Sequence, residues 1–277
     1  MNYRHIFHAG NFADVFKHVL LVRMLVHLAQ KAAAFRYLDT HAGTGLYDLS
    51  AEAAQRTGEW REGIGSLQAA DMPADCRALL APYLELVGPI NPGEGRMLYP
   101  GSPVLAQGLA RPQDRMTLCE LHPEDVQTLR STLGRDSRAK ALEIDGFTAL
   151  NAFLPPKERR GLVLVDPPFE AGDDMQRVAQ GVVRAHAKWA GGIYAIWYPV
   201  KDVDSGDWLA RQFAEAGIER RLRIELRVAG QSAENRLIGC GLLVINPPFT
   251  LAAQCQIILP ELARILGKGH EAGWRIK

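Results

Sequence analysis

Short apolar runs recur along the chain after an N-terminal helical segment. Turn-rich or helical stretches separate the runs, and Gly, Asp or Pro residues bound them. This pattern is typical of strands that are buried on both faces of a parallel sheet. The runs are Phe35–Leu38, Met116–Leu121, Ala141–Ile144, Leu162–Val165, Ile193–Trp197 and Leu242–Ile245. Because helical segments lie between them, we predict an α/β fold with βαβ units and a doubly wound, mostly parallel sheet.

Two further segments have other periodicities. Charged and apolar residues alternate from Arg221 to Val228, which predicts a strand near a sheet edge with one solvated face. Residues 11–31 instead have the spacing of an amphipathic helix, with Asn11 as its N-cap. The apolar stripe of this helix holds Phe12, Phe16, Val19 and Leu20, and the opposite face holds Asp14, Lys17 and His18.

An insertion is predicted between the first two strands. Acidic residues end both strands, at Asp39 and Glu120, and in an uninterrupted unit they would stand roughly 20 positions apart. Here they are much farther apart, and the intervening residues hold a helical apolar pattern and then the breaker-rich sequence GPINPGEG. A helix is expected to resume at Ser102, with Pro103 at its first position. We predict one domain over residues 1–277, with a small helical subdomain inserted at 49–98.

Composition and charge narrow the function classes only slightly. The 277 residues are 47% hydrophobic and 23% charged, which is ordinary for a soluble globular domain. No apolar run approaches the roughly 18 residues of a membrane span, and the N-terminal sequence has no secretory pattern. The four cysteines lack CxxC spacing, so we expect a cytoplasmic protein without a zinc ribbon. Since the net charge is only +1, a nucleic-acid partner would need a local basic patch.

Residues at three strand ends suit a nucleoside cofactor. The first strand runs into a glycine-rich turn, LDTHAGTG at 38–45, where glycines let the backbone approach a ligand. The turn lacks the full GxGxxG spacing, which disfavours NAD. Glu120, at the end of the second strand, is placed to accept hydrogen bonds from ribose hydroxyls. Asp145, followed by Gly146, is placed to meet an adenine amine after the third strand. Each pattern alone is also typical of an ordinary turn or a surface carboxylate.

The fourth strand ends in a more specific motif, Asp166-Pro167-Pro168-Phe169. Two prolines fix the backbone and leave carbonyl groups without neighbouring N–H donors. The Asp166 carboxylate and the Pro167 carbonyl are therefore placed to accept both hydrogens of a planar amine. Phe169 offers a flat face on which a base can stack. An adenine N6 lone pair is delocalised into the ring, and two acceptors on its hydrogens would aim it at a methyl group. A stiff loop without chemistry is the plainer alternative.

A second motif of this kind, Asn246-Pro247-Pro248-Phe249, also follows an apolar strand. Asn-Pro-Pro-aromatic sequences serve amine methylation too, so strand order has to distinguish the two motifs. Counted from the glycine-rich turn, Asp166 ends the fourth strand. Asn246 ends the last strand, beyond the crevice where strand order reverses and ligands bind. We therefore predict that Asp166 is the catalytic residue.

With several other motifs, these residues resemble the bacterial RlmJ methyltransferases over essentially the whole chain. The motifs are Tyr3-Arg4-His5, Phe7–Asn11, Ala13-Asp14, Lys17-His18, LDTHAGTG, YPGSP at 99–103, ELHP at 120–123, DPPF at 166–169 and YAIWYPV at 194–200. The resemblance implies a class I, Rossmann-like fold with a seven-stranded sheet and a small helical insertion. It also implies S-adenosylmethionine-dependent methylation of N6 of one adenine in 23S ribosomal RNA.

The resemblance further implies roles for single residues. Asp166 would be catalytic and would also contact S-adenosylmethionine, and no metal is implied. The other implied cofactor contacts are His18, His41, Ser102, Glu120, Asp145 and Gly146. The implied substrate-binding residues are Tyr3, His5, Lys17, Pro167 and Phe169. Residues 1–10 would form a tail over the active site, although a frayed terminus is the alternative. Phe169 stands where the family often has Tyr, so any role of that hydroxyl is lost.

Direct in-line transfer from sulfonium to amine, without a covalent enzyme intermediate, is the expected mechanism. Two other functions stay open from the sequence: methylation of DNA adenine or protein glutamine, and an inactive Rossmann-like RNA-binding module. For ribosomal RNA we expect a monomeric enzyme acting on protein-free RNA or an early assembly intermediate, with no membrane partner. Local arginines would contact the RNA backbone. The candidates are Arg56, Arg61, Arg159, Arg160 and the Arg221–Arg227 face.

Overall fold

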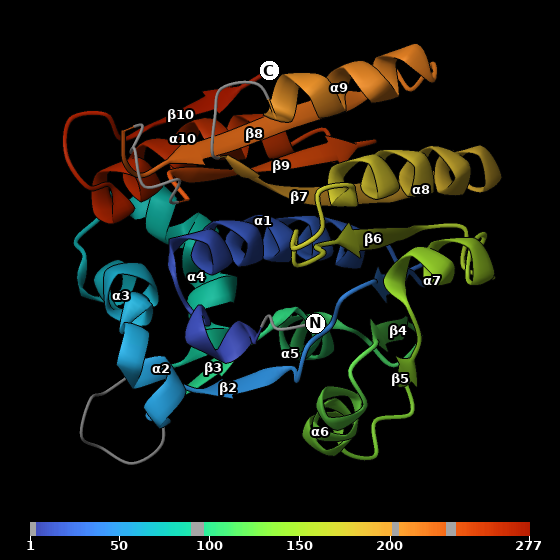
Figure 1. Cartoon of the computed structure of the whole chain (residues 1–277), viewed down its shortest axis with the longest axis horizontal. Helices are drawn as coiled ribbons and strands as arrows, with labels where there is room; N and C mark the ends of the chain where they lie inside the picture. The colour runs from blue at the N-terminus through green and yellow to red at the C-terminus, as the bar shows by residue number, and fades with distance from the viewer. Residues whose placement is uncertain (1–3, 90–96, 201–204, 231–236) are drawn as a thin grey trace.

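An eight-stranded sheet forms the centre of the molecule in the computed structural model, which describes residues 4–89, 97–200, 205–230 and 237–277 (Figure 1). In spatial order its strands are β10 (Gly273–Ile276), β8 (Arg221–Arg227), β9 (Gly239–Ile245), β7 (Ile193–Val200), β6 (Gly161–Val165), β1 (Arg36–Asp39), β4 (Arg115–Glu120) and β5 (Ala139–Glu143). A separate antiparallel pair joins β2 (Leu46–Asp48) to β3 (Leu98–Pro100).

The five neighbouring strands from β5 to β7 run parallel, whereas β9 is antiparallel to both β7 and β8. All six apolar runs and the alternating segment form strands, which confirms the predicted doubly wound, mostly parallel sheet. The predicted count of seven strands is one too low, because β10 pairs antiparallel with β8 at the sheet edge. This C-terminal strand is short and has no apolar run, so periodicity did not reveal it.

Helices cover both faces of the sheet. They are α1 (Phe12–Ala29), α5 (Ser102–Leu109), α6 (Pro123–Leu133), α7 (Gly146–Ala152), α8 (Asp174–Lys188), α9 (Ser205–Glu215) and α10 (Leu251–Leu266). Alternate strand residues face two hydrophobic clusters. Leu162 and Leu164 join the cluster packed against α1, α5, α6 and α10, whereas Val163 and Val165 join the one packed against α7, α8 and α9. Within the described ranges, no helix combines the length and apolarity needed to cross a lipid bilayer.

Helix α1 begins where the sequence predicts, because the Asn11 side chain accepts hydrogen bonds from the backbone N–H groups of Ala13 and Asp14. The predicted polar face is present on this helix, but it is not exposed to solvent. Asp14, Lys17 and His18, on the polar face, are only 2%, 6% and 1% exposed. Helices α4 (Ala74–Val87), α5 and α10 and strands of the sheet pack around α1, so its polar face lines a cavity instead of the outer surface.

Strand β8 also departs from the solvated face that its alternation predicts. It lies second from the sheet edge, between β10 and β9. Arg223 on its charged face is only 4% exposed, because α9 packs over β8 and Asp207 pairs with the guanidinium. Glu225, also on β8, lies 3.4 Å from the same guanidinium. Part of the charged face is therefore paired inside the protein.

Between β2 and β3 the chain forms a series of short helices. They are α2 (Glu52–Thr57), the π-helical turn η2 (Arg61–Gly65), α3 (Ser66–Ala69) and α4 (Ala74–Val87), on the left of Figure 1. Leu67 and Leu80 of these helices belong to the same hydrophobic cluster as Leu20 and Val244 of the main fold. The core is therefore continuous from the sheet into the insertion. That residues 49–98 behave as a separate subdomain stays a prediction.

Candidate active site

The carboxyl ends of the parallel strands open into one cavity of about 1000 Å³. Strand order reverses there, since β4 and β5 follow β1 on one side and β6 and β7 lie on the other. Ligands of doubly wound sheets bind at this position. Every sequence-predicted site residue that the structure describes lines the cavity: His5, Lys17, His18, His41, Ser102, Glu120, Asp145, Gly146, Asp166, Pro167 and Phe169. Tyr3 lies outside the described residues.

Glu120 holds the glycine-rich turn after β1. Its two carboxylate oxygens accept the backbone N–H groups of Gly43 and His122, each at 2.9 Å. Gly43 has a φ of +61°, and a Cβ at this position would collide with the Tyr47 hydroxyl. The turn therefore requires glycine here, and Glu120 ties it to the end of β4.

Asp39 lies under this turn and was not among the predicted site residues. It is fully buried, and one carboxylate oxygen accepts the hydroxyls of Tyr37 at 2.7 Å and Ser102 at 2.6 Å. Burial raises the pKa of Asp39 to about 6, because the two hydrogen bonds offset only part of the lost hydration. Asp39 thereby fixes the Ser102 hydroxyl, at the start of α5, in the cavity wall.

The loop after β5 packs directly against the turn after β1. Gly146 has no room for a side chain, because a Cβ would collide with the carbonyl oxygen of Thr40. Asp145 caps α7 by accepting the Thr148 N–H at 2.8 Å. Burial lowers the pKa of His41 to about 4, so its imidazole is neutral at pH 7. These two loops form one wall of the cavity.

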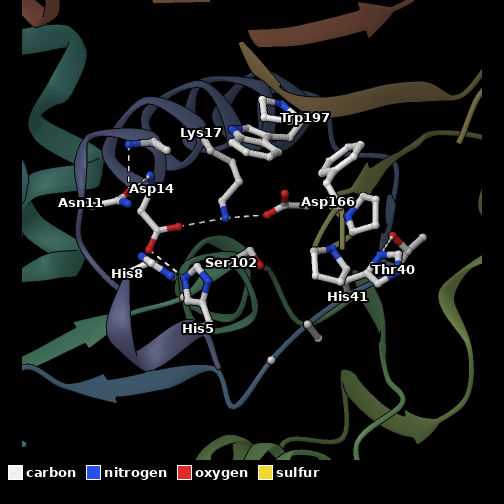
Figure 2. A pocket seen from close by; sticks show the side chains of 18 of the residues that line it. His5, His8, Asn11, Asp14, Lys17, Thr40, His41, Ser102, Asp166 and Trp197 are labelled. Atoms are coloured by element: carbon white, nitrogen blue, oxygen red, sulfur yellow. Dashed lines mark hydrogen bonds and ion pairs between the residues drawn. The ribbon is translucent and has the colours of Figure 1, made fainter. Parts of the chain in front are cut away.

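The Asp166-Pro167-Pro168-Phe169 loop supplies another part of the cavity wall. The Asp166 carboxylate accepts a hydrogen bond from Lys17 Nζ at 2.6 Å (Figure 2). Phe169 has a left-handed backbone conformation with φ of +52°. Its ring centroid lies 5.6 Å from that of Trp197 on β7. The two rings give the cavity an aromatic surface. Only Phe169 was predicted from the sequence to belong to the site.

Lys17 bridges Asp166 to a second carboxylate, Asp14, whose oxygen lies 2.9 Å from the same Nζ (Figure 2). Asp14 also binds the His5 ring at 2.9 Å and the Gly10 N–H at 3.0 Å. Burial alone would raise the pKa of Asp14, but His5 and Lys17 hold it well below its usual range. Burial would lower the pKa of Lys17, but Asp14 and Asp166 hold it well above its usual range. Asp14 and Lys17 therefore stay charged near neutral pH.

His18, on the same helix face, is hydrogen-bonded toward the insertion. Its Nδ1 lies 2.8 Å from the Tyr99 hydroxyl, which lies 3.0 Å from the Tyr83 hydroxyl. Burial lowers the pKa of His18 to about 3, so the ring is neutral at pH 7. Its Nε2 lies 4.0 Å from the Asp14 carboxylate, which is beyond hydrogen-bonding distance.

A family model described as Ribosomal RNA large subunit methyltransferase D, RlmJ, matches residues 32–277. The chain is 43% identical over 274 residues to Ribosomal RNA large subunit methyltransferase J of Escherichia coli strain K12, covering 98% of this chain and 96% of the relative. The chain belongs to the RlmJ family. The protein of the same name from Haemophilus influenzae is 41% identical over 280 residues, covering 100% of this chain and 98% of the relative.

A solved structure is similar to this RlmJ family member over its length. It is the crystal structure of a Legionella pneumophila protein, 34% identical, with a TM-score of 0.87 and 98% of both chains covered. The resemblance carried by the sequence motifs is thus confirmed. So is the class I methyltransferase fold, since a methyltransferase family and a doubly wound, mostly parallel sheet occur together. The roles of single residues stay predictions.

The second Pro-Pro motif of this RlmJ family member lies away from the cavity. Because β9 runs antiparallel to β7, Asn246 follows β9 beside the start of β7. Its side-chain amide donates to the carbonyl oxygens of Ala190 at 2.7 Å and Gly192 at 2.8 Å. Phe249 is 84% exposed and lies against His27. Asn246 therefore holds the turn that enters β7.

The arginines predicted to contact RNA are dispersed over the fold. Arg160 precedes β6, at the amino ends of the parallel strands, and donates to the carbonyl oxygens of Leu28 and Ala33. Arg61 lies over the ring of Trp60 in the insertion. Within the described ranges, no group of three or more His, Cys, Asp or Glu side chains is arranged to hold a metal ion.

Proposed function

We propose that this RlmJ family member transfers the methyl group of S-adenosylmethionine to N6 of an adenine in 23S ribosomal RNA. One observation carries the proposal: the Asp166-Pro167-Pro168-Phe169 loop opens into the same cavity as the glycine-rich turn and Glu120. An amine-binding motif thus faces a site of the type that binds nucleoside cofactors. Both named relatives are called large-subunit ribosomal RNA methyltransferases, which supports the choice of RNA.

The cavity suits S-adenosylmethionine in size and in chemistry. Gly43 and Gly146 have no side chains, so a ligand can approach the backbone directly at these two points of the cavity wall. Glu120 uses two acceptor positions on backbone N–H groups, and a carboxylate has about four, so two are left for ribose hydroxyls. The proposed cofactor contacts are His18, His41, Ser102, Glu120, Asp145, Gly146 and Asp166. When bound, the cofactor supplies a methyl group activated by its sulfonium charge.

Asp166 and Pro167 are proposed to hold the target amine. The carboxylate and the carbonyl accept its two hydrogens, which draws the N6 lone pair out of the ring and aims it at the methyl group. Asp166 does not have to remove a proton before attack, because the amine becomes acidic only once it is methylated. Stacking on Phe169, with Trp197 beside it, contributes roughly 1–3 kcal/mol. Holding the two reactants in line then lowers the barrier to transfer further.

Lys17 is proposed to orient Asp166 for this task. Its Nζ uses one position on the carboxylate, and the remaining lone pairs are available to the amine. Asp14 holds Lys17 from the other side and links it to His5. We propose that His5 and Tyr3 approach the base from the tail formed by residues 1–10, as the family resemblance implies.

The RNA must deliver an unstacked adenine to the cavity. Unstacking costs a few kcal/mol and costs least in loops or single strands. Backbone contacts to local basic side chains would make binding weaken steeply as salt is raised. We propose that the enzyme acts as a monomer on protein-free 23S RNA or an early assembly intermediate.

Substrate choice tests the proposal. Tritiated-methyl S-adenosylmethionine is supplied with unmodified, protein-free 23S RNA, with DNA of the same sequence, or with glutamine-bearing ribosomal proteins. We expect incorporation into the RNA alone, recovered as N6-methyladenosine after digestion. Incorporation into DNA or protein instead would overturn the assignment of the substrate. RNA binding without transfer to any of the three would indicate an inactive RNA-binding module.

A further inference from the structure

Three buried side chains connect the cavity to the insertion. His18 on α1, Tyr99 on β3 and Tyr83 on α4 are each no more than 1% exposed. The His18 Nδ1 and Tyr99 hydroxyl lie 2.8 Å apart, and the two tyrosine hydroxyls lie 3.0 Å apart. Among the described residues, these are the only hydrogen bonds of the Tyr99 and Tyr83 hydroxyls. Spacing along the chain does not predict that these three residues are joined.

The direction of this chain follows from counting protons. A neutral histidine carries one N–H, on either Nδ1 or Nε2, and each tyrosine carries one O–H. If Nδ1 carried the proton, it would donate to Tyr99 and Tyr99 would donate to Tyr83. The Tyr83 O–H would then have no acceptor among the described residues, and a buried donor without an acceptor is costly. In the opposite direction, Tyr83 donates to Tyr99 and Tyr99 donates to Nδ1, so every hydroxyl proton has an acceptor.

We infer that Tyr99 is a positioning residue: its hydroxyl donates to Nδ1 of His18 and fixes the histidine proton on Nε2, as a hydrogen-bond donor toward a ligand in the cavity. Tyr83 supports this arrangement, because its O–H donates to the Tyr99 oxygen and the Tyr99 O–H is then available to donate to His18. The inference rests on the proposed function for one point, that the ligand is S-adenosylmethionine. The group it meets would be a hydrogen-bond acceptor of that cofactor, such as its carboxylate.

The surroundings of His18 favour this neutral donor form. Burial lowers its pKa to about 3, and the neighbouring side chains of Lys17 and His5 act in the same direction. Asp14 opposes them but lies too far from Nε2 for a hydrogen bond, at 4.0 Å. A neutral ring donates from Nε2 only if Nδ1 is unprotonated, which makes the Tyr99 hydroxyl decisive.

The tautomer can be read directly, without any activity. Protein labelled with ¹⁵N-histidine is examined by long-range ¹H–¹⁵N correlation spectra at pH 7, and the His18 signals are assigned with the variant His18→Gln. The test variants are Tyr99→Phe and Tyr83→Phe. Tyr194→Phe is the matched control, because Tyr194 is also fully buried but its hydroxyl donates to the Trp189 carbonyl. Thermal denaturation of each variant checks that the fold is kept.

We expect the wild type, Tyr83→Phe and Tyr194→Phe to have the proton on Nε2, and Tyr99→Phe to have a mixture of tautomers. We also expect the Kd for S-adenosylmethionine, by calorimetry, to rise about 3- to 10-fold in Tyr99→Phe only, the effect of one lost hydrogen bond. A wild-type proton on Nδ1 would overturn the inference. So would a Tyr99→Phe variant with unchanged tautomer, or with the same Kd as Tyr194→Phe. Failure of RNA methylation alone would contradict the proposed function and leave the tautomer result standing.

Discussion

Asp14 and Asp39 are both buried at the cavity, yet their surroundings shift their pKa values in opposite directions. Burial raises the pKa of any carboxyl group. The pKa of Asp14 is lowered in spite of its burial, because His5 and Lys17 lie against the carboxylate. The hydrogen bonds of Asp39 come from neutral groups, including the hydroxyls of Tyr37 and Ser102, so burial prevails. Asp14 is thus charged at neutral and mildly acidic pH, whereas Asp39 becomes charged only above mildly acidic pH.

The Asp39 pKa predicts a pH-dependent stability difference. The pKa of Asp39 is about 6 in the folded protein, compared with an ordinary value of 3.8. Between these two pH values the carboxyl group is therefore protonated in the folded protein and ionised in the unfolded chain. The wild-type free energy of unfolding, relative to Asp39→Asn, should therefore fall as pH rises from about 4 to 6 and be level above that. The total change is on the order of 3 kcal/mol at 1.36 kcal/mol per pKa unit. Urea denaturation of both proteins at several pH values measures it, and a difference that is flat or rises with pH would contradict it.

At the residue scale, the sequence revealed the side chains that sit at strand ends and missed those whose role depends on distant neighbours. Asp166 and Glu120 lie at the carboxyl ends of predicted strands, so strand order alone brings them to one edge of the sheet. Asp39 was visible as a strand end, but its burial depends on Ser102, which arrives from beyond the insertion. Trp197 lies inside an apolar run that reads as core. Its contact with Phe169 becomes apparent only when β6 and β7 pair.

Helix α7 begins against the turn that follows β1, which makes Gly146 a sensitive position. Alanine would favour the helix by about 1 kcal/mol, but its Cβ would collide with the backbone carbonyl of Thr40, which cannot move aside easily. Gly146→Ala should therefore lower both the melting temperature and the affinity for S-adenosylmethionine. Gly191→Ala is the control, since a Cβ there meets nothing within 4 Å. Calorimetry and thermal denaturation compare the two, and equal behaviour would contradict the close packing of the two loops.

Helices and strands with a strong hydrophobic periodicity were predictable from the sequence. Features that depend on pairing with another element were not. The buried strands each carry an apolar run, and Asn11 marks the start of α1. Strand β10 has no such run and exists because β8 offers a free edge. The burial of Arg223, on the charged face of β8, depends on α9, which lies earlier in the chain. Periodicity reports which faces differ in polarity, but it does not report what packs on them.

At the scale of the whole molecule, the insertion shares one hydrophobic core with the sheet. Leu80→Ala, in α4, should therefore destabilise the entire protein by about 2–5 kcal/mol, as expected for a buried leucine. Leu98→Ala is the matched control, because Leu98 on β3 is 40% exposed. Far-ultraviolet circular dichroism and tryptophan fluorescence should report one coincident urea transition in each protein. Two separate transitions, with only one shifted by Leu80→Ala, would contradict a shared core.

The general architecture followed from the chain-wide pattern, because βαβ units allow few topologies. The gap between the first two acidic strand ends located the insertion without showing how it packs. The RNA-binding surface was not predictable in the same way. A net charge of +1 gives no overall field, and the candidate arginines include Arg160 and Arg223, which make internal bonds. Local charge patches depend on folding and cannot be read from spacing alone.

The assignment of Asp166 to the amine site is tested most directly by single-turnover transfer of a tritiated methyl group to unmodified 23S RNA at saturating S-adenosylmethionine. Wild type, Asp166→Ala and Asn246→Ala are compared, with circular dichroism confirming the fold of each. We predict that Asp166→Ala lowers the rate about 100-fold or more, the usual effect of removing a preorganised group that stabilises a transition state. Asn246→Ala should stay within a few-fold of wild type. A wild-type rate for Asp166→Ala, or selective loss of transfer in a folded Asn246→Ala, would contradict the assignment of the amine site.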